Sequence, residues 1–270
     1  MIGPLRILAA VLCGVIATTA AAQNSGLSRL TDREDLLGWE AVGRLDMSGA
    51  GFCTGTLIAS DLVLTAAHCV YHPGSRKLVE AGQLMFRAGL RDGTSIAESA
   101  VSQIAAHPGY DPNRAFDGEN IRHDVALLRL KQPINTSQAD PFVLHSGQVG
   151  QSTVSVVSYG EGRAEALSRQ RECKIVGTFE DIMAFDCNVT FGSSGAPVFS
   201  RTGGRGRIVS VVSGMAVING DRLAVGMSLP EVVDQLKRNL RAEAPRPTAS
   251  VRRITVGQNR SGTGAKFVKP

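Results

Sequence analysis

The chain has 270 residues, of which 43% are hydrophobic and 20% charged, and its formal net charge is +5. This length and composition fit a globular protein with a full core, either one large all-β domain or two smaller lobes that share an interface. Beyond the N-terminus no apolar run is long enough to span a bilayer, which excludes a protein built of membrane-spanning helices.

The positive charge is concentrated at the C-terminus. Residues 241–270 hold seven Lys or Arg and one Glu, so the rest of the chain is close to neutral. This distribution gives no sign of a specific nucleic-acid partner for the folded part of the protein.

Residues 1–22 have the features of a secretory signal peptide. Arg6 precedes an apolar stretch from Ile7 to Ala17, and three alanines, residues 20–22, come before Gln23. This order predicts export to a periplasm or to the cell exterior, with a mature N-terminus near Gln23 and no membrane span after signal removal. Residues 23–38 then form an N-terminal segment or a short propeptide.

Four cysteines remain once the signal, which contains Cys13, is removed. An even number of cysteines in an exported chain predicts two disulfides. Three pairings are possible, and the short separations favour one of them. That pairing joins Cys53 to Cys69 and Cys173 to Cys187.

Short runs rich in Val, Ile, Leu and Thr recur along the chain, separated by Gly, Pro, Asn or Asp. This pattern predicts strands of an all-β barrel or sandwich. The runs are Thr56–Ala59, Leu62–Thr65, Leu84–Ala88, Val125–Leu130, Thr153–Ser158, Ile182–Cys187, Ala196–Phe199, Arg207–Ser213 and Leu223–Ser228.

A helical period appears only near the end of the chain. After Pro230, the apolar residues Val232, Val233, Leu236 and Leu240 share one face of a helix, so a single C-terminal helix is predicted to close the fold. Residues 241–270 follow it, and their Pro, Gly and Arg content predicts a mostly disordered basic tail. The alternative is a segment that binds anionic surfaces or nucleic acid.

Three segments carry the side chains of nucleophilic catalysis. His68 lies in "LTAAHC", Asp124 in "HDVALL" and Ser194 in "GSSGAP". Each has a structural explanation when taken alone: a core histidine, a strand-end cap and a turn residue. Together they form a chemical unit, because a serine needs an imidazole to accept its proton and the imidazole needs a buried carboxylate to orient it.

These three motifs resemble those of the chymotrypsin/trypsin-like serine peptidases, and within them the small bacterial branch that includes the glutamyl endopeptidases. The resemblance extends from about Trp39 to the terminal helix and implies a peptidase domain over residues 39–240. It implies two six-stranded Greek-key β-barrels with His68, Asp124 and Ser194 in the cleft between them. It also implies that the backbone N–H groups of Gly192 and Ser194 form the oxyanion hole.

The sequence departs from trypsin-like zymogens immediately before the nucleophile. Those proteins have an Asp there, which pairs with a newly cut N-terminal amine, whereas this chain has Ser193. A hydroxyl cannot form that ion pair, so we expect this activation switch to be absent. Signal removal, or trimming near Arg29 or Arg33, would then be enough to give active enzyme.

The resemblance also suggests which residues contact the substrate side chain. Asn188 stands where trypsin-like enzymes have the Asp that binds Arg or Lys, and Val212 where glutamyl endopeptidases have a His. We therefore expect a pocket for a small or medium uncharged side chain. Its expected residues are Asn188, Thr190, Val212 and Gly226, with Ser213 and Gly214 in the wall strand.

The same residues are compatible with other functions. Cys53, His68, Cys69 and His72 could suggest zinc, but export favours a disulfide and the cysteine spacing is too wide for a zinc finger, so no metal or cofactor is expected. An α/β-hydrolase is disfavoured because "GSSGA" lacks the G-x-S-x-G elbow. The remaining alternative is an inactive, peptidase-like protein-binding module. We expect a monomer that acts on proteins or peptides.

Overall fold

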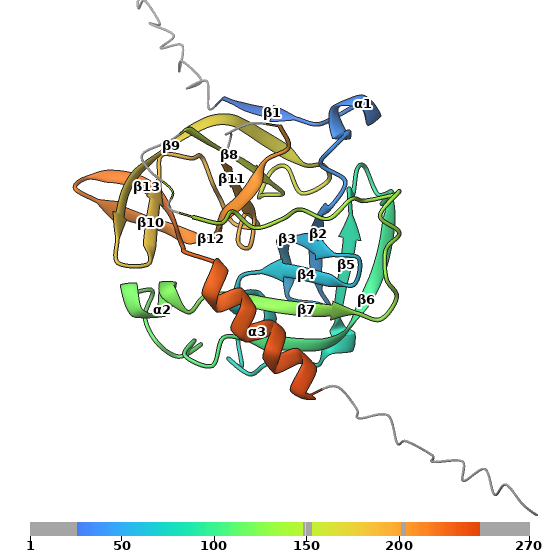
Figure 1. Ribbon diagram of the computed structural model, residues 1–270, viewed down its shortest axis with the longest axis horizontal. Helices are drawn as coiled ribbons and strands as arrows, with labels where there is room; N and C mark the ends of the chain where they lie inside the picture. Colours follow the sequence, from blue (N-terminus) through green and yellow to red (C-terminus); the bar gives the residue numbers. More distant parts are fainter. Residues whose placement is uncertain (1–25, 148, 150–152, 201–203, 244–270) are drawn as a thin grey trace, which may run out of the picture.

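A computed structural model describes residues 26–147, 149, 153–200 and 204–243, and two β-barrels form its body (Figure 1). The expected signal peptide lies outside the described residues, as does the tail beyond Glu243. The prediction of an all-β fold with two barrels and a C-terminal helix is confirmed.

The first barrel is closed by six antiparallel strands in the order β2-β3-β4-β7-β6-β5. Its interior is filled with apolar side chains, and Leu45, Leu64 and Phe86 are completely or almost completely buried. The strands are β2 (Val42–Met47), β3 (Gly51–Ala59), β4 (Leu62–Thr65), β5 (Leu84–Ala88), β6 (Ala97–Ala106) and β7 (Ala126–Leu130).

The second barrel has the order β9-β10-β13-β12-β11-β8, and β8 pairs back onto β9 to close it. A short N-terminal strand, β1 (Leu27–Arg29), adds to the outer side of β9. The barrel strands are β8 (Thr153–Ser158), β9 (Ser168–Phe179), β10 (Ile182–Phe185), β11 (Pro197–Ser200), β12 (Arg207–Ile218) and β13 (Asp221–Met227).

Helix α3 (Pro230–Glu243) carries the chain from the second barrel back to the first, where it lies across β6 and β7 (Figure 1). Val233, Leu236 and Leu240 are fully buried in the main apolar core, as the helical period predicts, and Val232 is partly buried. The structure adds two single-turn helices that the sequence did not predict, α1 (Arg33–Leu36) and α2 (Gly118–Arg122), and 3-10 turns at Ala67–Val70 and Ala81–Gln83.

The two disulfides join the cysteines that the sequence spacing favoured. Cys53 on β3 bonds to Cys69 in the first 3-10 turn, and Cys173 on β9 bonds to Cys187 just after β10. The first disulfide braces the turn that carries His68, and the second braces the approach to the loop that carries Ser194.

Candidate active site

The three predicted catalytic residues come from both barrels. His68 lies in the 3-10 turn after β4, and Asp124 lies between α2 and β7, so the first barrel supplies both. Ser194 lies in the turn between β10 and β11 of the second barrel. His68 and Ser194 line the same two cavities, which lie between the barrels.

The carboxylate of Asp124 fixes the imidazole of His68. Its Oδ2 atom lies 2.7 Å from Nδ1 of His68, and its Oδ1 atom accepts a hydrogen bond of 2.8 Å from the backbone N–H of His68. Ser213 adds a third hydrogen bond, because its hydroxyl donates to Oδ2 of Asp124 at 2.5 Å. The Asp124 side chain is 3% exposed and that of His68 33%, so one edge of the imidazole remains open to the cleft.

The environment of His68 favours its charged form. Burial opposes the positive charge, but the charge of Asp124 and its hydrogen bond outweigh burial, so the pKa of His68 is raised above 6.5. A base with this pKa is suited to accept a proton from a serine hydroxyl and to hold it while the substrate reacts.

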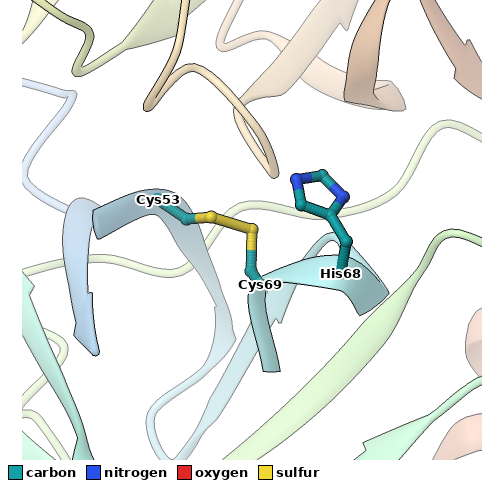
Figure 2. Close-up of side chains that lie close together, drawn as sticks. All are labelled: Cys53, His68 and Cys69. Atoms are coloured by element: carbon teal, nitrogen blue, oxygen red, sulfur yellow. A yellow bond between two sulfur atoms is a disulfide. The ribbon is translucent and has the colours of Figure 1, made fainter. Parts of the chain in front are cut away.

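A disulfide lies directly beside His68. The side chains of Cys53, His68 and Cys69 come together within 4.8 Å, the kind of grouping that could suggest a metal site (Figure 2). The two sulfur atoms are bonded to each other, however, so neither is available as a thiolate ligand. The group is better explained as a brace that holds the 3-10 turn under His68.

Gly192 occupies a position that only glycine fits. Its φ angle is +87°, in the region that side-chain-bearing residues avoid, and an added Cβ would lie 2.3 Å from Cε2 of Phe52. Phe52 belongs to β3 of the first barrel, so Gly192 allows the serine loop to approach the opposite barrel closely.

Two hydrogen bonds orient the peptide planes around Ser194. The carbonyl of Phe191 accepts a hydrogen bond of 2.7 Å from the backbone N–H of Glu161. The carbonyl of Ser193 accepts one of 2.9 Å from the backbone N–H of Ala196. In a trans peptide the N–H points away from the carbonyl of the same plane, so these bonds also set the directions of the Gly192 and Ser194 N–H groups. Within the described residues, neither N–H donates to a protein acceptor, which leaves both free for an oxyanion.

Thr54 ties the serine loop to the first barrel. Its hydroxyl donates to the carbonyl of Gly192 at 2.9 Å and accepts from the N–H of Tyr159 at 3.1 Å, while its own N–H donates to the carbonyl of Ser194. No local pattern in the sequence indicates Thr54, because these contacts join distant segments.

Comparison with known proteins then identifies the family. The trypsin family profile matches residues 33–228, which is most of the chain. The chain belongs to the trypsin family. One solved relative in fold is a Glu endopeptidase, with a TM-score of 0.66 and 17% sequence identity over 81% of this chain and 97% of the other. Another is the thermostable serine protease AL20, with a TM-score of 0.60, 18% identity and coverage of 76% and 98%.

Curated relatives match over shorter stretches. Serine protease SP24D of Anopheles gambiae is 28% identical over 64% of this chain and 60% of its own length. Serine protease 56 of Mus musculus is 33% identical over 40% of this chain and 17% of its own length. Clotting factor C of Tachypleus tridentatus is 28% identical over 34% of this chain, and the match spans only 9% of that protein.

In this trypsin-family chain the two cavities differ in size and lining. One measures about 600 Å³ and lies toward Phe52 and the Cys53–Cys69 disulfide. The other measures about 820 Å³ and is lined by Thr190, Val212, Ser213 and Gly214, four of the six residues expected to contact the substrate.

Asn188 and Gly226, the other two expected pocket residues, do not line either cavity. Asn188 is exposed, and its backbone N–H donates to the side chain of Gln170 at 2.6 Å. Gly226 is buried between strands, where an added Cβ would lie 2.1 Å from the carbonyl oxygen of Val211. Two apolar residues that the sequence did not indicate, Phe116 and Val189, line the larger cavity instead.

Proposed function

We propose that the protein is an exported serine endopeptidase that cleaves peptide bonds through an acyl-enzyme. Ser194 attacks the scissile carbonyl carbon while His68 accepts its proton, and Asp124 holds the imidazole in place. The N–H groups of Gly192 and Ser194 stabilise the oxyanion of the tetrahedral intermediate. His68 then gives the proton to the leaving amine, and water releases the acyl group by the same steps.

One observation carries this proposal. Asp124 is buried, accepts hydrogen bonds from His68 and Ser213, and faces an imidazole that shares a cavity with Ser194. A histidine with only a structural role would need neither a buried carboxylate on one side nor an open cavity on the other. The combination supports general-base catalysis at Ser194.

Covalent labelling tests the proposal. A fluorophosphonate should label the wild-type protein at Ser194, and Ser194→Ala should abolish labelling and lower peptide hydrolysis by roughly 10⁴-fold or more. The matched control is Ser102→Ala, which removes an exposed hydroxyl on β6 and should leave both rates unchanged. Folded wild-type protein that is neither labelled nor hydrolytic would instead favour the protein-binding module.

The larger cavity supports a preference for a small or medium uncharged residue before the cleaved bond. Val212 and Thr190 bring no charge to the part of the cavity that they line. The carboxylates of the cavity are Asp124, held by His68 and Ser213, and the exposed Glu161, and its other charged groups are Arg76, Arg114 and Arg222. We expect a peptide library to be cleaved mainly after uncharged residues. A profile dominated by Arg and Lys, or by Glu, would contradict this preference.

We propose that residues 1–22 direct export and that the peptidase domain covers residues 39–240, with a basic tail at 241–270. Two disulfides support an oxidising compartment. No helix in the described part of the chain has both the length and the apolar character needed to cross a membrane. Placement in the glutamyl-endopeptidase branch rests on the sequence motifs, with the fold of the Glu endopeptidase as support.

A further inference from the structure

A half-buried cation lies beside the serine loop. The guanidinium of Arg163 donates from Nη1 to the carbonyl of Ser158 at 2.6 Å, and from Nη2 to the hydroxyls of Ser158 and Ser193 at 3.0 Å each. None of the ion pairs among the described residues involves Arg163, so in this part of the chain its partners are neutral oxygen atoms. Burial lowers the pKa of Arg163 to about 10.

The hydroxyl of Ser193, the residue before the nucleophile, is the centre of this network. Ser193 is fully buried, and its Oγ atom donates to the carbonyl of Tyr159 at 3.1 Å. The same oxygen accepts from Arg163 and, at 3.3 Å, from the backbone N–H of Thr190. A hydroxyl has one proton to donate and two lone pairs, so these three bonds fill its capacity, and the Ser158 hydroxyl, 3.3 Å away, competes for the same positions.

Arg163 also closes the turn that orients the oxyanion hole. Its backbone N–H donates to the carbonyl of Gly160 at 2.9 Å, which shapes the turn containing Glu161. Glu161 in turn holds the carbonyl of Phe191, and this bond directs the N–H of Gly192. On the Phe191 side of Gly192 it is therefore the backbone of residue 163 that shapes the turn, whereas on the Ser193 side the Arg163 side chain makes the contact itself.

The space around the guanidinium is shaped to hold it. A Cβ added to Gly160 would lie 2.8 Å from Cζ of Arg163 and 2.8 Å from Cγ2 of Thr190. Any larger residue at Gly160 would displace the guanidinium from the serine loop. The close fit, together with three donated hydrogen bonds, is what allows a cation to remain there without a carboxylate.

We propose that Arg163 is the positioning residue of the oxyanion loop, holding Ser193 and the 158–163 turn so that Gly192 presents its N–H to the substrate. This inference rests on the proposed function. In zymogens of the kind this sequence resembles, a newly cut N-terminal amine pairs with an Asp at the position of Ser193. Here the cation belongs to an internal side chain, so the loop is ordered without a cut.

Substitution of Arg163 tests this role. Arg163→Gln should lower kcat by roughly 10- to 100-fold with KM changed by less than about threefold, because the loss concerns transition-state stabilisation rather than substrate binding. Arg163→Lys keeps the charge but cannot bridge both serines, so its kcat should lie between that of the wild type and that of Arg163→Gln. The matched control is Arg129→Gln, which removes a half-buried arginine paired with Asp61 on the first barrel and should retain wild-type kcat.

Two further measurements separate positioning from a purely structural role. Added ethylguanidinium should restore part of the kcat of Arg163→Gly without affecting the wild type. Ser193→Asp should keep activity when Arg163 is present, since an ion pair replaces the hydrogen bond, and should lose it when combined with Arg163→Gln. The effect of Ser193→Ala should not add to that of Arg163→Gln.

The outcomes separate this inference from the proposed function. Wild-type protein that fluorophosphonate does not label would overturn both. Labelled wild type, with kcat of Arg163→Gln within about twofold of it, would overturn the positioning role alone. If Arg163→Gln does not fold, Arg163→Lys and Ser193→Ala provide the test. A wild-type kcat in both variants would overturn the positioning role of Arg163.

Discussion

At the scale of single residues, the geometry of the site depends on hydroxyl groups as well as on the candidate catalytic residues. Ser213, expected only as part of the pocket wall, donates to Asp124 and helps to hold its carboxylate toward His68. Thr54 links two segments of the second barrel, at Gly192 and Tyr159, to the first. Each of these hydroxyls is buried, so if it is removed, its hydrogen-bond partner stays unpaired because no water can reach it.

Two threonines on β3 allow the contribution of Thr54 to be isolated. Thr54→Val leaves the carbonyl of Gly192 and the N–H of Tyr159 unpaired, so we expect a loss of about 1–3 kcal/mol in unfolding free energy. We also expect kcat to fall on the order of tenfold, because the oxyanion loop loosens. Denaturant unfolding and peptide hydrolysis measure the two effects.

Thr56→Val is the matched control. Thr56 is equally buried on the same strand, but its hydroxyl has no hydrogen-bond partner within the described structure, so its removal should be neutral or stabilising. Equal losses in the two variants would show that the Thr54 hydroxyl has no special role.

The raised pKa of His68 predicts the pH dependence of activity. The imidazole must be neutral to accept a proton, so the acid limb of kcat/KM should lie above pH 6.5. In Asp124→Asn only burial still acts on His68, and the limb of any residual activity should move below pH 6.5. A wild-type limb at or below pH 6.5 would contradict this account.

The raised pKa of His68 also makes the free energy of unfolding depend on pH. Because the folded pKa of His68 lies above the unfolded value, its pair with Asp124 stabilises the fold fully below pH 6.5. This contribution is lost as the pH rises through the folded pKa.

At the scale of elements, the strands that the sequence predicts are those rich in apolar or β-branched residues. The boundaries of β4, β5 and β8 were predicted to the residue. β9 (Ser168–Phe179) was missed because its sequence is polar, with Arg171 and Glu172 exposed and only Cys173 and Ile175 supplying buried apolar side chains. β12 was predicted too short, because it continues to Ile218 as a partly exposed hairpin with β13.

The N-terminal strand favours one of the two maturation routes left open by the sequence. β1 pairs with β9, Arg29 forms an ion pair with Asp92, and the N–H of Leu30 donates to the carbonyl of Leu167 at 2.8 Å. Trimming near Arg33 would remove these contacts with both barrels. We therefore propose that the segment from Leu27 onward stays with the mature protein.

A substitution at Leu30 tests the contribution of this segment. Leu30 is 7% exposed in the apolar core, so Leu30→Ala should cost about 2 kcal/mol or more in unfolding free energy. Leu37→Ala removes a leucine that is 63% exposed nearby and should change stability by less than about 0.5 kcal/mol. Equal stabilities, measured by thermal unfolding, would show that the segment can be dispensed with.

At the scale of the whole molecule, contacts that cross between the barrels hold the cleft together. The hydroxyl of Tyr159, in the second barrel, donates to the carbonyl of Leu90, which follows β5 of the first barrel, at 2.9 Å. Helix α3 leaves β13 and buries its apolar face on the first barrel (Figure 1). The two halves of the site, His68 with Asp124 and the serine loop, are thereby kept at a fixed separation.

The sequence by itself determined the fold class, both disulfides and the identity of the candidate catalytic residues. These features depend on local order: strand composition, two cysteine pairs with short separations, and three motifs with characteristic neighbours. Gly192 could also be singled out, because its position in the turn before Ser194 requires glycine.

Only the tertiary structure decided how the site is held in its working geometry. Thr54 and Gly192 are 138 residues apart, and Ser213 and Asp124 are 89 residues apart. Arg163 meets Ser193 across 30 residues, and neither side chain carries a motif that predicts the contact. These bonds form because the closure of each barrel and the packing of one barrel on the other determine which strand ends lie side by side. No local sequence pattern predicts those contacts.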